Sequence, residues 1–281
     1  MLLTDLRAQY RKALAGNYQE EEIDSIFFRL LEHFLGLPRF IIGLEPKRFL
    51  LREEEEPLLQ GLNRLLQGEP VQYITGKAFF MDLELAVGPG VLIPRPETEE
   101  LVMWALEILE NRPKPVILDA GTGSGCIALA LASALPAATV HALEISTEAL
   151  RLARQNNSQL DLEVAFHQGD MCDPPDLPKN LDLLISNPPY IPDIESESLD
   201  KHVREFEPHQ ALFSPDDNPL KFYKCLAKMG LEQLKPEAFL LVETHYQYAR
   251  EVAAIFETAG YRDIQVKNDI FGKERMVCAV K

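Results

Sequence analysis

Apolar side chains recur at intervals of three and four in two stretches of the first seventy residues, 23–34 and 58–66. This spacing places them on one face of a helix. The first stretch is followed by Gly36 and Pro38 and the second by Gly68 and Pro70, and these residue types commonly end helices. The pattern predicts a small all-helical domain over residues 1–70.

From residue 71 the pattern changes to short strand-like runs. Leu83, Leu85 and Val87 occupy alternate positions, and a turn sequence of glycine and proline follows at 88–90. Alternation of this kind is typical of a half-buried strand, and the turn residues favour a hairpin. We expect a β-hairpin linker over residues 71–92.

The remaining residues, 93–281, alternate between strand-like and helix-like segments. Helical stretches follow Gly125, Ser146, Pro219 and Tyr246. The expected strands are 116–119, 139–144, 162–167, 181–186, 239–244, 263–267 and 275–280. This rhythm predicts an α/β fold with a doubly wound, mostly parallel, seven-stranded sheet. Because the last two strands are joined by a short loop, they should pair antiparallel at one edge.

Composition narrows the choice of partner. The 281 residues are 46% hydrophobic and 26% charged, which is ordinary for a globular protein and excludes disorder as the main state. Asp and Glu number 44 against 28 Lys and Arg, for a net charge of −16. Such a surface repels phosphate backbones, so non-specific DNA binding is not expected and a basic protein partner suits the charge better.

The cysteines and the hydropathy pattern indicate a cytoplasmic protein. Cys126, Cys172, Cys225 and Cys278 lie far apart, with no CxxC pair and no histidine at zinc-finger spacing. We therefore expect buried thiols in a reducing compartment, with neither a disulfide framework nor a metal site. No segment has the ~20 consecutive apolar residues that cross a bilayer, and the first residues lack a secretory signal pattern.

A glycine-rich loop follows the first long strand of the second half. Asp119 ends the apolar run 116–119, and the loop continues as Gly121, Thr122, Gly123, Ser124 and Gly125. Glycines there let a ligand lie against main-chain N–H groups at a helix N-terminus. Glu144, at the end of the next strand, can accept the hydroxyls of a ribose. The other interpretation is a tight turn with an incidental surface acid.

The spacing in this loop separates the candidate nucleotides. Its third glycine comes one position earlier than in the GxGxxG dinucleotide fingerprint, and no GxxxxGK[ST] motif is present. The loop resembles the first motif of class I S-adenosylmethionine-dependent methyltransferases. That resemblance implies that the loop, with Asp119, faces the methionine part and that Glu144 holds the ribose. It also implies that Asp170 and Met171, after the third strand, border the adenine.

The tetrapeptide Asn187, Pro188, Pro189 and Tyr190 follows the fourth strand. Ligands of open α/β sheets bind at the carboxyl ends of the strands. An amide nitrogen is a poor nucleophile, and two acceptors that hold both of its hydrogens can aim it at a sulfonium methyl group. The Asn187 side-chain oxygen and the Pro188 carbonyl can be those acceptors, and Tyr190 can form a flat wall. A simple proline-rich turn is the alternative.

Four further segments, 76–80, 92–99, 203–212 and 269–275, resemble signature segments of the peptide-chain release factor glutamine methyltransferase family. With the loop and the tetrapeptide, the resemblance spans about residues 71–280. It implies transfer of a methyl group from S-adenosylmethionine to the glutamine of the Gly-Gly-Gln motif in class I release factors. It also implies a substrate-recognition role for the N-terminal domain.

Alternatives remain open for the chemistry and for one site residue. An adenine-N6 DNA methyltransferase also uses an Asn-Pro-Pro-Tyr motif, although the negative charge disfavours it. A nicotinamide oxidoreductase conflicts with the glycine spacing, and a non-catalytic nucleotide-binding adaptor leaves the tetrapeptide unexplained. Arg95, between two prolines, could orient the substrate or the tetrapeptide, or it could pair with Glu97 or Glu99.

Overall fold

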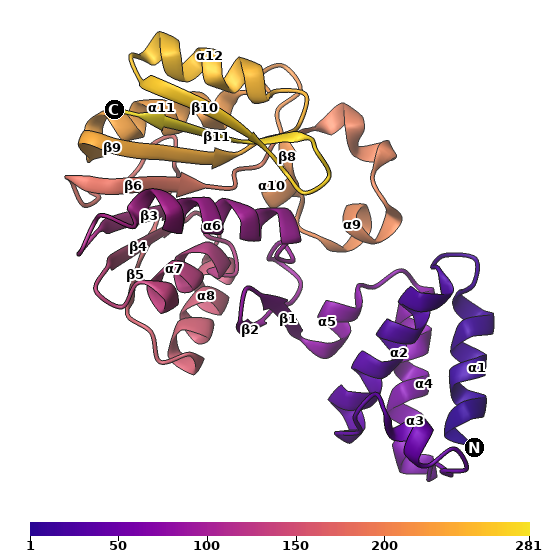
Figure 1. The fold of residues 1–281 in the computed structure, drawn as a ribbon. Helices are drawn as coiled ribbons and strands as arrows, with labels where there is room; N and C mark the ends of the chain where they lie inside the picture. Colours follow the sequence, from indigo (N-terminus) through magenta and orange to yellow (C-terminus); the bar gives the residue numbers. More distant parts are fainter. The chain divides into compact units, whose positions relative to one another are not determined.

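A computed structural model describes the backbone of residues 1–281 and every side chain except those of Ser198 and Lys201 (Figure 1). The chain forms two compact units. The first comprises residues 1–76 and 200–206, and the second comprises residues 77–199 and 207–281. The domain limits at 70 and 92 stay predictions, but segment 200–206 joins the first unit although it lies far along the chain.

The first unit is helical, as its apolar spacing indicates. Its helices are α1 (Leu3–Leu14), α2 (Glu20–Leu35), α3 (Ile41–Leu44), α4 (Arg52–Leu66), α5 (Val71–Thr75) and α9 (Lys201–Phe206). Tyr10 of α1 packs edge-on against Phe27 of α2, with ring centroids 5.0 Å apart. Asp24 accepts hydrogen bonds from Arg7 and Arg11, which hold the pKa of its carboxyl well below the usual range. The unit therefore has its own apolar core.

The expected hairpin begins later than the sequence pattern suggests. Residues 71–75 form the short helix α5, so the strand interpretation of these residues is wrong. Pro70 is the N-cap of this helix, and Gly76 ends it with φ +69°. The hairpin itself is β1 (Lys77–Phe80) paired antiparallel with β2 (Leu83–Ala86). Proline at a helix start and a left-handed glycine at its end suffice for one turn of helix.

The second unit contains the predicted seven-stranded sheet. Its order is β10-β11-β9-β6-β3-β4-β5. The strands are β3 (Val116–Ala120), β4 (Thr139–Glu144), β5 (Val164–Gln168), β6 (Leu181–Ser186), β9 (Leu234–Glu243), β10 (Arg262–Asn268) and β11 (Glu274–Val280). The first five pair in parallel, and β11 runs antiparallel to both β9 and β10. The predicted fold class is confirmed.

Helices cover both faces of this sheet (Figure 1). On one face α6 (Pro96–Leu109) and α7 (Cys126–Ala134) pack on apolar strand residues. On the other face lie α11 (Lys221–Gln233) and α12 (Ala249–Ala259). The remaining elements are α8 (Thr147–Gln159), the 3₁₀ helix Asp193–Ser198, α10 (His209–Leu212) and the small parallel pair β7 (Ile191–Pro192) and β8 (Phe213–Ser214). With both faces of the sheet covered, every residue of β6 is buried.

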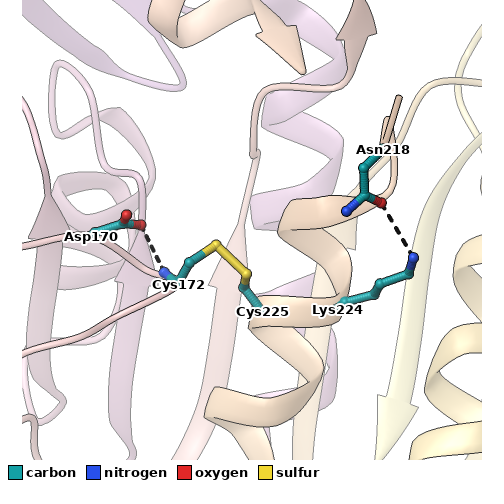
Figure 2. The surroundings of a disulfide bond; sticks show 5 residues. All are labelled: Asp170, Cys172, Asn218, Lys224 and Cys225. Carbon is teal, nitrogen blue, oxygen red and sulfur yellow. Dashed lines mark hydrogen bonds between the residues drawn. A yellow bond between two sulfur atoms is a disulfide. The ribbon is translucent and has the colours of Figure 1, made fainter. Parts of the chain in front are cut away.

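One expectation about the cysteines is wrong. Cys172, in the segment after β5, forms a disulfide bond with Cys225 of α11, whereas Cys126 and Cys278 are free (Figure 2). The two bonded cysteines are 53 positions apart in the sequence. Spacing along the chain could not reveal this pair, because only the folded sheet brings the segment after β5 beside α11.

None of the helices in the described chain combines the length and apolar character that a bilayer crossing requires.

The disulfide should contribute measurably to stability. Closing a loop of this length restricts the unfolded chain, by roughly 2–4 kcal/mol in typical cases. We expect a reducing agent to lower the free energy of unfolding of the native protein by about that amount in urea titrations. The Cys172→Ser/Cys225→Ser variant is the control and should show no further effect of the reductant. Equal stability of the oxidised and reduced proteins would contradict the prediction.

Candidate active site

A cavity of about 440 Å³ lies at the carboxyl ends of the parallel strands in the second unit. Its walls come from the loop after β3, the ends of β4 and β5, the tetrapeptide after β6, and the segment before α6. The volume falls within the ~300–1,000 Å³ of typical ligand pockets. Its position is the one where open α/β sheets bind ligands.

The glycine loop forms one wall of this cavity. Gly121, Thr122, Gly123 and Ser124 line it, and the N–H groups of Gly121 and Thr122 donate to the Leu143 carbonyl of β4. Gly121 has φ +79°, and a Cβ there would lie 3.0 Å from the Met171 methyl group. Gly125, the N-cap of α7, has φ +86° and does not line the cavity among the described residues. Its role is to turn the chain into α7.

Glu144 lies at the cavity beside this loop. One carboxylate oxygen accepts from the Gly123 N–H at 2.9 Å, and the other accepts from the Ser146 N–H at 2.8 Å. A carboxylate oxygen has two lone pairs. Each therefore keeps capacity for a ligand hydroxyl while the main chain holds the side chain in place.

Asp119 differs from its predicted place. Its carboxyl group is fully buried behind the loop and is not part of the described cavity wall. One of its oxygens accepts from the Thr122 hydroxyl at 2.5 Å and from the Ala128 N–H at 3.2 Å. Burial raises the pKa of Asp119 to about 7, although these two hydrogen bonds act against the rise. Asp119 thus supports the loop and α7 from behind.

Asp170 and Met171 both line the cavity after β5, and their contact with an adenine stays a prediction. An Asp170 carboxylate oxygen accepts from the Cys172 N–H at 2.8 Å, as Figure 2 shows. The disulfide partner of Cys172 lies in α11, whose residues Lys221 and Phe222 also line the cavity. The disulfide therefore joins two of its walls.

Within the tetrapeptide, Asn187 and Pro189 line the cavity, whereas Pro188 and Tyr190 are not among the described lining residues. Tyr190 packs against the apolar layer beneath α11, and its hydroxyl donates to Glu243 at 3.0 Å. The prediction of a flat Tyr190 wall is not met, because the buried carboxylate draws the hydroxyl away from the cavity. Burial raises the pKa of this hydroxyl.

Two residues that the sequence interpretation did not single out complete the site. Thr98, in the first turn of α6, lines the cavity and donates from its hydroxyl to Glu243 at 2.7 Å. Its oxygen accepts from the Asn187 side-chain N–H at 3.0 Å. Glu243 ends β9 and is 1% exposed. The sequence contained a signal for Glu243, because an acidic residue at the end of an apolar strand also identified Glu144 as a candidate site residue.

The structure gives Arg95 an ion-pair partner that the sequence interpretation did not name. Arg95 lines the cavity and forms an ion pair with Glu207, not with Glu97 or Glu99. The Glu207 side chain is fully buried and also accepts from the Ile93 N–H at 3.1 Å. This fixes the guanidinium at the cavity edge. Among the described residues, no group of three or more His, Cys, Asp or Glu side chains is placed to hold a metal ion.

The raised pKa of Asp119 predicts a pH-dependent stability. The unfolded chain ionises this acid near its usual pKa of 3.8, whereas the folded state keeps the proton up to about 7. Folding therefore weakens as pH rises from about 4 to 7. We expect the stability of the native protein relative to Asp119→Asn to fall by roughly 4 kcal/mol at most across that window. Urea unfolding at each pH measures this difference in unfolding free energy, and Asp217→Asn, at an exposed residue, is the control. A difference that does not change with pH would contradict the prediction.

Comparison with known proteins finds methyltransferases. Residues 103–204 match the methyltransferase small domain, and residues 5–76 match the PrmC N-terminal domain. A solved methyltransferase from Pyrococcus furiosus superposes with a TM-score of 0.52 at 15% identity, over 82% of this chain and 99% of that one. At that identity the similarity supports the fold alone.

Full-length relatives identify the family. A release factor glutamine methyltransferase from Bacteroides thetaiotaomicron is 39% identical over 98% of both chains. A protein of the same name from Flavobacterium psychrophilum is 36% identical over 99% of this chain and 98% of its own. Since these matches extend through both the helical unit and the sheet, the chain belongs to the release factor glutamine methyltransferase family.

Proposed function

We propose that this enzyme methylates the side-chain amide nitrogen, N5, of the glutamine in the Gly-Gly-Gln motif of class I peptide-chain release factors. The observation that carries the proposal is the position of Asn187. It lies at the end of β6 in the same cavity as the glycine loop and Glu144, with its amide hydrogen-bonded from behind. A planar amide held beside a nucleoside site suits the capture of another planar amide.

The cavity fits S-adenosylmethionine, the cofactor of this class of methyltransferase. Gly121 and Gly123 have no side chains and leave room for its amino-acid part beside the loop. The spare lone pairs of Glu144 suit the ribose hydroxyls, and Met171 offers an apolar surface for the base. When bound, the cofactor supplies an electrophilic methyl group on a positively charged sulfur.

The residues of the chain position the substrate and do not need to supply a strong base. Asn187 Oδ1 accepts one hydrogen of the glutamine NH₂, and we assign the other to the Pro188 carbonyl, as the family resemblance implies. Holding both hydrogens aims the nitrogen at the methyl group. Once methylated, the nitrogen is acidic and releases its proton to water. Arg95, fixed by Glu207, is placed to contact the substrate backbone.

A protein substrate in the cytoplasm fits these features better than DNA. The net charge of −16 opposes binding to a phosphate backbone. The family name supports release factors, which act in translation, as the partner. We assign recognition of the partner to residues 1–70, which lie within the N-terminal helical unit. We assign the chemistry to residues 93–281, with 71–92 as the linker.

Mass spectrometry of a release factor tests the proposal directly. Incubation with enzyme and methyl-labelled S-adenosylmethionine should add a single labelled methyl group to the Gly-Gly-Gln glutamine. A release factor with that glutamine replaced by asparagine is the control and should stay unlabelled. Labelling of DNA instead of the release factor would favour the adenine-N6 alternative.

The role of Asn187 can be separated from cofactor binding. Asn187→Ala removes the acceptor that acts on the reacting nitrogen, so kcat should fall roughly 10²- to 10³-fold. Calorimetric titration should show S-adenosylmethionine binding within about threefold of the native value. Asn218→Ala, at a residue outside the cavity, serves as control. Near-native turnover by Asn187→Ala would end this mechanism.

A further inference from the structure

Glu243 and Thr98 lie behind the reactive tetrapeptide and form hydrogen bonds that lead to Asn187. Strands β6 and β9 run in parallel, with Ser186 opposite Val242, so Asn187 and Glu243 leave the sheet side by side. Thr98 of α6 lies between their side chains and bonds both. Thr98 is 2% exposed and Glu243 is 1% exposed. A buried carboxyl group is costly unless it is hydrogen-bonded, and the Glu243 carboxyl is bonded by Thr98 and Tyr190 beside Asn187.

The direction of these hydrogen bonds follows from what each group can donate. An ionised carboxylate only accepts. The two oxygens of Glu243 accept from the Thr98 hydroxyl at 2.7 Å and from the Tyr190 hydroxyl at 3.0 Å. Thr98 gives its single proton to Glu243, so toward Asn187 it can only accept. The Asn187 amide therefore turns Nδ2 toward Thr98, at 3.0 Å, and presents Oδ1 on the opposite side.

This direction matters because an amide can be turned over at little cost in shape. A reversed Asn187 would present an NH₂ group to the NH₂ group of the substrate, and neither could accept from the other. We propose that Glu243 and Thr98 are positioning residues that hold the Asn187 amide with its oxygen toward the substrate nitrogen. Glu243 also holds Tyr190, so one carboxylate orients both ends of the tetrapeptide.

The pKa of the Glu243 carboxyl is raised on balance, chiefly by burial and also by the nearby charge of Glu97. The hydrogen bonds from Thr98 and Tyr190 and the charge of Arg275 act against this rise. These three contacts favour the ionised form that the chain of hydrogen bonds requires. The inference rests on the proposed function for its consequence in catalysis, but the orientation of Asn187 can be measured without any turnover.

Two substitutions at Thr98 separate hydrogen bonding from packing. Thr98→Val keeps the volume and removes the hydroxyl, whereas Thr98→Ser keeps the hydroxyl and removes the methyl group. We expect Thr98→Val to lower kcat on the release factor roughly ten- to a hundredfold, with S-adenosylmethionine affinity within about threefold of native. Thr98→Ser should keep most of kcat. If Thr98→Ser loses as much as Thr98→Val, or if neither loses activity, the proposal is overturned.

A spectroscopic readout tests the orientation itself. With ¹⁵N-labelled asparagine, the side-chain NH₂ signal of Asn187, assigned by its absence in Asn187→Ala, should be protected from solvent exchange in the native protein and in Thr98→Ser. It should shift and lose protection in Thr98→Val. An unchanged signal in Thr98→Val would contradict the proposal. This result stands even if the native enzyme does not methylate release factors, an outcome that would count against the proposed function alone.

Further variants guard against failure to fold and against non-specific effects. Glu243→Gln keeps the shape but adds a donor that permits the reversed direction, so it should reproduce the loss of kcat and of NH₂ protection. It replaces Thr98→Val if that variant does not fold, and native behaviour of Glu243→Gln would equally overturn the proposal. Thr139→Val, at an exposed position at the start of β4, is the matched control and should keep native activity.

Discussion

The buried carboxylate of Glu243 is the constraint on which the active-site geometry depends. It ends a central strand in an apolar layer, and hydrogen bonds from Thr98 and Tyr190 satisfy its two oxygens. Since a buried charge left without partners is costly, these contacts are strongly favoured once the sheet has formed. The tetrapeptide after β6 is thus held by its neighbours β9 and α6 and not only by its own prolines.

Acids held by hydrogen bonds at the ends of strands also occur beside the glycine loop of the cavity. Glu144 ends β4 and accepts from main-chain N–H groups on both sides, and Asp119 supports the glycine loop from behind. Parallel strands bring their carboxyl ends to one edge of the sheet. Acids at those ends therefore lie close together in space. Glu144 faces the cavity, whereas Asp119 and Glu243 form hydrogen bonds to residues of the cavity wall. The disulfide to α11 joins the segment after β5 to another wall of the cavity.

Periodicity predicted the architecture, and motif spacing singled out several of the residues that line the cavity. Strand candidates 139–144 and 181–186 agree with β4 and β6, because apolar runs bounded by turn residues leave few alternatives. Residues whose roles depend on contacts across the fold were not predictable in this way. Tyr190 turns inward because of Glu243, Asp119 is covered by its own loop, and Cys172 meets Cys225 only after the sheet has formed. Residues 71–75 were misassigned because one helical turn leaves almost no periodic signal.

A crystal structure of the enzyme with S-adenosylhomocysteine and a peptide containing Gly-Gly-Gln tests the central claim most directly. The account predicts that the glutamine side-chain nitrogen lies within about 3.2 Å of Asn187 Oδ1, with Asn187 Nδ2 still bonded to Thr98. A glutamine amide bound elsewhere in the cavity, or one that meets Asn187 while Thr98 contacts a different group, would contradict it.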